Sequence, residues 1–133
     1  MHLKCDLAGD PLDVHLTGNG ASDSRQFETL LDIGPEVTPR GVVGDKGYDA
    51  HANREAARAR GICAIIPHRK NAKEKPRFFA GHLYRLRARI EQFIGKIKRF
   101  KRVAMRCEKT KQNFASIVAL ACVFVLVKTV HTA

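Results

Sequence analysis

The stretches Gly41-Val-Val-Gly-Asp-Lys-Gly-Tyr-Asp49 and Ile62-Cys-Ala-Ile-Ile66 decide the fold of this 133-residue chain. Each contains a short apolar run next to glycine, which is typical of a buried strand. Residues 49–60 between them predict a helix that is capped by Asp49 and stops at Gly61. Strand, helix and strand in this order predict a parallel pair with a right-handed crossover. Asp45 would then stand at the carboxyl end of a strand, where α/β domains bind ligands.

The segments on either side of this unit complete an α/β domain. Alternating apolar residues in 2–6 and 12–17 predict a two-strand hairpin, and a helix over 23–33 follows, capped by Ser22 or Asp23. Beyond a basic loop we expect a helix over 82–102 and an apolar helix over 110–130. The apolar face that anchors the first of these helices would consist of Leu83, Leu86, Ile90, Phe93, Ile94 and Ile97. The order of these elements predicts one mixed sheet with flanking helices.

The chain divides its charge unevenly between its two halves. Residues 1–60 hold seven Lys and Arg against ten Asp and Glu, and residues 61–133 hold seventeen against three, which gives the net charge of +11. A basic second half predicts nucleic acid as the partner, because such a surface can neutralise phosphates. An anionic membrane surface is a weaker alternative, since the basic stretch lacks a broad apolar face.

The four cysteines, Cys5, Cys63, Cys107 and Cys122, form no C-x-x-C pair, so neither a zinc site nor a disulfide framework is indicated. The uncharged run 114–127 is fourteen residues long. A bilayer-crossing helix needs roughly 20 apolar residues, so this run predicts a buried core helix and no membrane span.

Residues 75–107 contain eleven Lys and Arg residues and a single acid, Glu91. On a helix at 100° per residue Glu91 falls in one polar stripe, within roughly 60° of arc. The stripe consists of Tyr84, Arg87, Glu91 and Lys98. Two interpretations are open: a metal ligand where a nucleic-acid backbone is held, or half of an ion pair with Arg87. For Asp45 the alternatives are a metal ligand and an ordinary strand-end turn, with Lys46 as an ion-pair partner.

The segment Gly44-Asp-Lys-Gly-Tyr-Asp49, together with the stripe from Tyr84 to Lys98, resembles the catalytic half of bacterial insertion-sequence transposases of the DDE type. The likeness covers most of the chain, including residues 2–23 and 62–71. Either motif alone is weak, but the two together are specific.

The resemblance implies an RNase H-like α/β fold in which Asp45 and Glu91 are catalytic and hold Mg²⁺ or Mn²⁺. It implies that Tyr84, Arg87 and Lys98 contact donor-end DNA beside that glutamate. Arg99, Lys101, Arg102 and Arg106 would add phosphate contacts. The family uses three carboxylates and two divalent ions for in-line attack at phosphorus.

The chain departs from the family pattern at its amino end. No Asp-Ser/Gly-Thr segment supplies the first aspartate, and Asp6 is a weak third metal ligand. We therefore expect residues 1–133 to be one partial catalytic domain without its first strand, made of a core (1–110) and an apolar terminal helix (110–133). It would be the downstream product of two reading frames, inactive alone, and either a homo-oligomer or a partner of the upstream product. A bacterial cytoplasmic, nucleoid-associated location is expected.

Two further hypotheses belong to other classes of function. The chain could be a non-enzymatic DNA-binding fragment that regulates transposition, or a basic RNA-associated structural protein. The second offers no reason for the polar stripe on the 82–102 helix.

Overall fold

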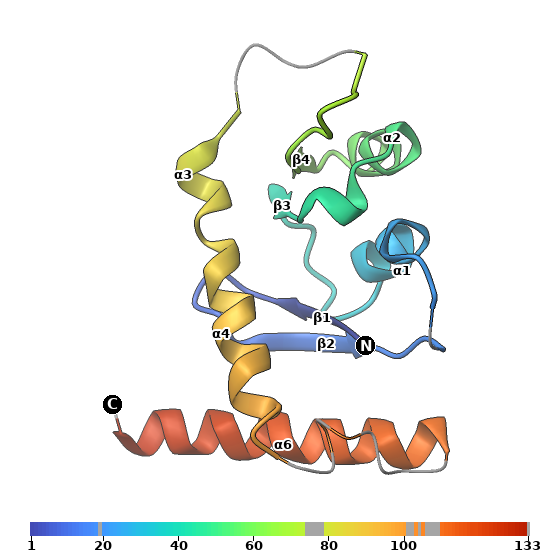
Figure 1. The fold of residues 1–133 in the computed structure, drawn as a ribbon. Helices are drawn as coiled ribbons and strands as arrows, with labels where there is room; N and C mark the ends of the chain where they lie inside the picture. Colours follow the sequence, from blue (N-terminus) through green and yellow to red (C-terminus); the bar gives the residue numbers. More distant parts are fainter. Residues whose placement is uncertain (19, 74–78, 101–102, 104, 106–109, 133) are drawn as a thin grey trace. The chain divides into compact units, whose positions relative to one another are not determined.

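In a computed structural model the chain forms two compact units (Figure 1). The structure describes residues 1–18, 20–73, 79–100, 103, 105 and 110–132. We call residues 17–88 the crossover unit, and residues 1–16 with 89–133 the hairpin unit. Three of the predicted DNA-binding residues, Lys101, Arg102 and Arg106, lie outside the described residues.

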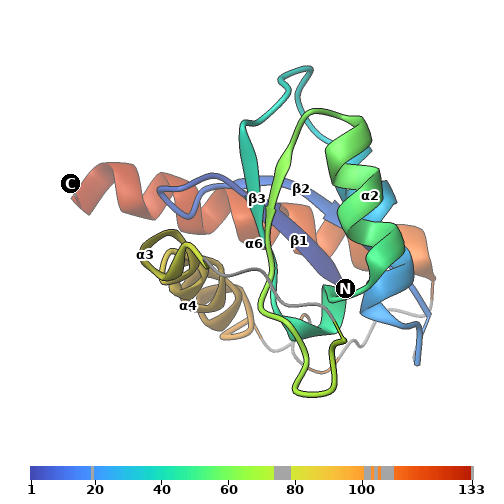
Figure 2. The ribbon, with the colours of Figure 1, turned by 90° about the horizontal axis from the view of Figure 1, so that it is seen from above.

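The crossover unit contains the predicted parallel pair. Strand β3 (Gly41–Val43) pairs with β4 (Cys63–Ile65) in parallel, with Val42 opposite Ala64. Helix α2 (His51–Ala59) connects them and lies beside both strands in Figure 2. Gly61 follows the helix with φ +69°, a left-handed conformation that glycine adopts without strain. The strand-helix-strand prediction is confirmed.

The core of the crossover unit lies between its helices and the parallel pair. Helix α1 (Phe27–Asp32) contributes two buried side chains, and α2 and the ends of β4 contribute the others. The core consists of Phe27, Leu31, Ala57, Ile62 and Ile66. Because Ile62 and Ile66 flank β4, the strand is anchored at both ends, and the polar turn that follows β3 has a fixed base.

The hairpin unit contains the predicted antiparallel pair. Strand β1 (His2–Cys5) pairs with β2 (Pro11–His15), with a register shift between Lys4 and Cys5. Its core joins this hairpin to α4 (Arg87–Ile97) and α6 (Lys111–Thr132), most of α4 belonging to this unit. The buried members are Leu3, Leu16, Phe93, Ile97, Val103, Phe114, Val118, Ala121, Cys122 and Val125.

The structure corrects the predicted sheet. Among the described residues, hydrogen bonds join the strands into two separate two-stranded sheets, β1–β2 and β3–β4, and not into one mixed sheet. The strands are only three to five residues long, and each pair belongs to its own unit. The α/β composition is correct, but the single sheet was wrong.

Two helix predictions also need correction. The helix expected over 82–102 is divided into α3 (Gly81–Tyr84) and α4, because Leu86 and Ala88 donate to carbonyls three residues back. This tighter turn leaves Leu83, an expected core residue, exposed. The helix expected over 23–33 begins as a 3₁₀ turn, η1 (Asp23–Gln26), and Ser22 at its N-cap makes no side-chain capping bond.

Helix α6 is apolar on more than one side. Five of its side chains lie in the core of the hairpin unit, as predicted for a core helix. Large apolar side chains on its other side are exposed, namely Leu120, Val123, Phe124, Val127 and Val130. By length and composition alone, the stretch Lys111–Lys128 could also cross a membrane, and 28% of it is buried. A core helix of a soluble protein passes the same test.

Two valines on α6 test this packing. Val118 is fully buried, and Val123 is 57% exposed. Val118→Ala should lower the free energy of unfolding by about 2 kcal/mol, because two buried methylene equivalents are lost and a cavity is left. Val123→Ala is the matched control and should change it by less than about 0.5 kcal/mol. Urea unfolding followed by circular dichroism measures both, and equal losses would contradict the packing.

Candidate active site

Asp45 occupies the turn that immediately follows β3. Gly44 extends the pairing of the strands by donating its N–H to the Ile65 carbonyl at 3.2 Å. Asp45 is then the N-cap of η2 (Lys46–Tyr48), and its Oδ1 accepts a hydrogen bond from the Gly47 N–H at 2.8 Å. Asp45 therefore belongs to a strand-end turn, one of the two alternatives for this residue. The turn fixes its carboxylate at the carboxyl end of a parallel strand, which is also the position expected of a ligand.

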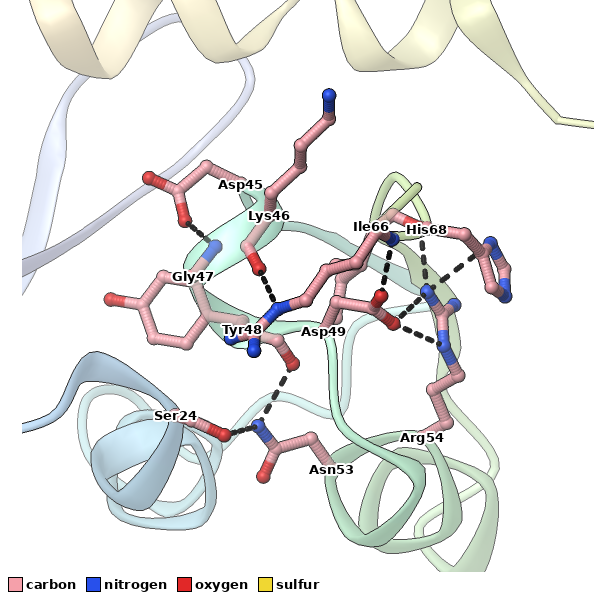
Figure 3. A network of polar contacts seen from close by, with 11 residues as sticks. Ser24, Asp45, Lys46, Gly47, Tyr48, Asp49, Asn53, Arg54, Ile66 and His68 are labelled. Carbon is pink, nitrogen blue, oxygen red and sulfur yellow. Dashed lines mark hydrogen bonds and ion pairs between the residues drawn. The ribbon is translucent and has the colours of Figure 1, made fainter. Parts of the chain in front are cut away.

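The second oxygen of Asp45 faces a cation. Arg87 Nη1 lies 3.7 Å from Asp45 Oδ2, which is an ion pair but too long for a hydrogen bond. The guanidinium also lies over the Tyr84 ring, 5.7 Å from its centre. Among the described residues the ion-pair partner of Asp45 is therefore Arg87, and the alternative that paired it with Lys46 is not the one observed. Figure 3 shows the Lys46 side chain extending away from the Asp45 carboxylate.

Gly47 lies between two carboxylates. A Cβ at this position would stand 2.9 Å from Asp45 Oδ1 and 3.3 Å from Asp23 Oδ2. The two carboxylate oxygens therefore lie no farther apart than these two distances added together. Sequence reasoning assigned Asp23 only a helix-capping role, since nothing in the sequence links positions 23 and 45. The structure adds Asp23 to the surroundings of Asp45.

Asn53 holds the segment that carries Asp23 against this turn. The buried Asn53 side chain donates from Nδ2 to Ser24 Oγ at 3.0 Å and to the Tyr48 carbonyl at 2.9 Å (Figure 3). Burial, and then the charges of Asp23 and Asp45, raise the pKa of Tyr48 to about 12. The Tyr48 hydroxyl therefore keeps its proton at neutral pH and stays a hydrogen-bond donor.

The sequence predicted that Asp49 caps α2, and this prediction was wrong. The N-cap position is Ala50, and the carboxylate of Asp49 turns instead toward the end of β4. Its Oδ1 accepts from Arg54 Nη2 at 2.8 Å and its Oδ2 from the Arg69 N–H at 2.6 Å (Figure 3). Arg54 also donates to the Ile66 carbonyl at 2.8 Å. This network joins the turn, α2 and the segment after β4.

The electrostatics of Asp49 follow from these contacts. Burial raises the pKa of this carboxyl, but the hydrogen bonds from Arg54 and from the backbone of Arg69 outweigh it, and the net shift is downward. His68, whose Nδ1 lies 3.5 Å from Arg54 Nη2, lowers the pKa further by its charge. Asp49 is therefore ionised at neutral pH and stabilises the network rather than acting as an acid.

The remaining predicted site residues lie in the hairpin unit. Glu91 is exposed on α4, while Phe93 and Ile97 on the same helix are buried and Ile90 and Ile94 are half-buried, as the apolar periodicity predicted. Lys98 and Arg99 are exposed and come directly after the helix.

Asp6, the weak third candidate for a metal ligand, closes a turn of the hairpin. Its Oδ1 accepts from the N–H groups of Gly9 and Asp10, each at 2.9 Å. Among the described residues no three His, Cys, Asp or Glu side chains gather closely enough to hold a metal ion.

Two family models match the chain, and both are described as a transposase DDE domain. One matches residues 1–82 and the other residues 42–128, so together they include the Asp45 turn and the whole of α4. The chain belongs to the DDE transposases.

Its relatives place it among the transposases of bacterial insertion sequences. It is 29% identical to the putative transposase for insertion sequence element IS402 of Burkholderia cepacia, over 99% of this chain and 64% of that protein. It is 33% identical to the putative transposase for insertion sequence element IS6501 of Brucella ovis, over 94% of this chain and 95% of that protein. The chain thus spans less than two thirds of the first relative. No solved structure matches it significantly.

The Asp49 network predicts a pH dependence of stability. Because the pKa of Asp49 in the folded chain lies below its ordinary value of 3.8, the unfolded chain takes up this proton first as the pH falls. The stabilisation is complete above about pH 5 and is lost as the pH falls through the folded pKa. Asp49→Asn should lower the free energy of unfolding by about 2 kcal/mol at pH 7 and weaken its decline in acid.

Urea unfolding between pH 7 and pH 2.5 measures this effect. Glu36→Gln, which removes the charge of an exposed acid, is the control and should change the free energy of unfolding at pH 7 by less than about 0.5 kcal/mol. An Asp49→Asn variant with the same acid profile as the unchanged chain would show that the network has no such role.

Proposed function

We propose that this chain supplies Asp45 and Glu91 to the catalytic site of an insertion-sequence transposase. The reaction is metal-dependent phosphoryl transfer on DNA, with strand cleavage at transposon ends followed by strand transfer. The fold behind it is RNase H-like, built from the β1–β2 hairpin and the β3–β4 crossover. Family membership supports the class of protein, and the surroundings of Asp45 support the site.

The observation that carries the proposal is the state of the Asp45 carboxylate. One oxygen is fixed by the Gly47 N–H, and the other faces Arg87 at a distance beyond hydrogen bonding. The side chain is 43% exposed, so the carboxylate is accessible to a further ligand. A carboxylate that served only the turn would need no cation beside it, whereas a site for phosphate and metal ions needs both charges.

The donors present suit Mg²⁺ or Mn²⁺. Both ions prefer carboxylate oxygens, and Mg²⁺ is usually held by one or two carboxylates together with waters and substrate phosphates. Asp45 and Glu91 are the residues that would hold such ions, and Asp6 is left out because its carboxylate closes a turn. When bound, the ions activate the attacking oxygen and stabilise the leaving oxygen.

The cations have a separate role in this proposal. Arg87 is placed by its contacts with Asp45 and Tyr84, so it can hold the phosphate to be cleaved without displacing the carboxylate. Lys98 serves the same DNA end, and Arg99 holds neighbouring phosphates, together with Lys101, Arg102 and Arg106. The partner is therefore DNA, bound by an oligomer or together with the product of an upstream frame in the bacterial cytoplasm.

A second candidate function is regulation by a DNA-binding fragment without catalysis. The charge of the second half of the chain, seventeen Lys and Arg against three acids, would suffice for such binding. It predicts DNA binding that is independent of divalent ions and unaffected by replacing Asp45 or Glu91.

The two functions are separated by replacing the carboxylates. Asp45→Asn and Glu91→Gln should each weaken Mn²⁺ binding, measured by titration calorimetry, by tenfold or more. With the product of the upstream frame added, each should also lower Mn²⁺-dependent nicking of a duplex carrying the transposon end by about 100-fold or more, a barrier increase of about 2.7 kcal/mol. Glu55→Gln, an exposed acid on α2, is the matched control and should change neither. Unchanged Mn²⁺ affinity and nicking in both variants would reject the catalytic assignment.

Gly47 gives an independent test of the same site. A methyl group at this position would lie 2.9 Å from Asp45 Oδ1, so Gly47→Ala must displace the carboxylate. The backbone of Gly47 does not have positive φ, and the chain should still fold. We expect Mn²⁺ affinity to fall several-fold with a melting temperature within a few degrees of the unchanged chain.

Gly95→Ala is the control for this substitution. Gly95 lies in α4 with no other atom close to an added Cβ. The change should leave Mn²⁺ affinity as it is and stabilise the helix by about 0.5–1 kcal/mol. Normal Mn²⁺ affinity in Gly47→Ala would show that the position of the Asp45 carboxylate is unimportant.

A further inference from the structure

A second polar side of α4 faces away from Glu91. At 100° per residue, Arg89, Gln92 and Lys96 lie roughly 100–160° around the helix from Glu91, at spacing i, i+3 and i+7. These three side chains are exposed. Neither Arg89 nor Lys96 is paired with an acid of the described part of the chain. Their charges are therefore available to an anion.

These side chains border a hollow within the hairpin unit. The hollow has a volume of about 180 Å³ and lies between α4, the turn that joins β1 to β2, and α6. It is lined by Ala8, Gly9, Asp10, Arg89, Gln92, Phe93, Lys96 and Leu126. Since a water molecule occupies about 30 Å³ in the liquid, the hollow has room for a phosphate group with part of its hydration.

Gly9 sets the position of Arg89 against the turn. Gly9 has φ +94°, and a Cβ there would stand 3.1 Å from the Cβ of Arg89. The turn therefore approaches the helix closely at this point. Its own N–H groups at Gly9 and Asp10 are already bound to Asp6 Oδ1, so the donors left for a ligand are the side chains of α4.

We propose that the hollow binds phosphates of a DNA backbone, at a place distinct from the phosphate that is cleaved. The inference rests on the proposed function for its ligand. Arg89 and Lys96 neutralise the phosphates, and Gln92 donates a hydrogen bond between them. Because the two sides of α4 are separated by the body of a helix about 10–12 Å wide, one phosphate cannot contact both Glu91 and this hollow. Asp10 is the one acid in the lining and weakens the binding.

The test measures DNA affinity without divalent ions, so its result does not depend on the metal site. The probe is a fluorescent 30-base-pair duplex of arbitrary sequence, titrated by anisotropy in EDTA at several NaCl concentrations. Arg89→Gln with Lys96→Gln should lower the slope of log affinity against log salt by about 2, which is about 1 per cation. Lys73→Gln with Lys111→Gln is the control of equal charge, and it should lower the slope by clearly less.

Asp10 supplies a variant with the opposite expectation. Asp10→Asn should raise the affinity for the same duplex several-fold, while Asp13→Asn, an equal change of charge outside the hollow, should raise it less. Equal slopes in the two double variants, or equal effects of the two aspartate substitutions, would overturn the proposal. Inorganic phosphate alone distinguishes the source of the anion. Titrated by calorimetry without DNA, it should bind at least tenfold more weakly than the duplex, whereas binding as tight as that of the duplex and lost in Arg89→Gln with Lys96→Gln would assign the hollow to free phosphate and overturn the proposal.

Discussion

The crossover unit depends on the hydrogen bonds that the Asp49 carboxylate accepts. Through Arg54 and the Arg69 N–H this carboxylate joins the turn after β3, helix α2 and the segment after β4, which lie up to twenty residues apart. A parallel pair of three-residue strands has few hydrogen bonds of its own. The charged network therefore fixes the geometry of the turn, and with it the direction in which Asp45 presents its carboxylate. The acid that stabilises the fold, Asp49, thus stands four residues from Asp45, the acid that we propose to be catalytic.

Local pattern predicted the parts of the fold that local interactions determine. The apolar runs at 41–43 and 62–66, with Gly61 between them, predicted the parallel crossover, and the alternation in 2–6 and 12–17 predicted the hairpin. The spacing of Ile90, Phe93, Ile94 and Ile97 predicted the buried face of α4. In each case the spacing of apolar residues is enough to predict the element, because burial of an apolar face dominates the free energy of folding.

Long-range polar contacts could not be predicted from the same pattern. Asp49 has the residue type of a helix cap and stands one residue before the N-cap of α2, yet it binds a backbone N–H twenty residues away. Asp23 approaches Gly47 because Asn53 and the contact between the Phe27 and Tyr48 rings connect their segments. The tight turn at Leu86 divides the helix expected over 82–102, although residues 82–94 contain no proline or glycine to mark it. Such features depend on which segments meet, and a single sequence does not contain that information.

The exposed side of α6 has a consequence for the chain in solution. Five large apolar side chains stand on one helix of a protein with net charge +11. Mutual repulsion keeps such molecules apart over a Debye length, which is about 30 Å at 0.01 M salt and about 8 Å at 0.15 M. Short-range apolar attraction does not weaken with salt in this way. The purified chain should therefore be most dispersed in dilute buffer and coalesce as electrolyte is added, unlike a protein whose colloidal behaviour is governed by charge alone.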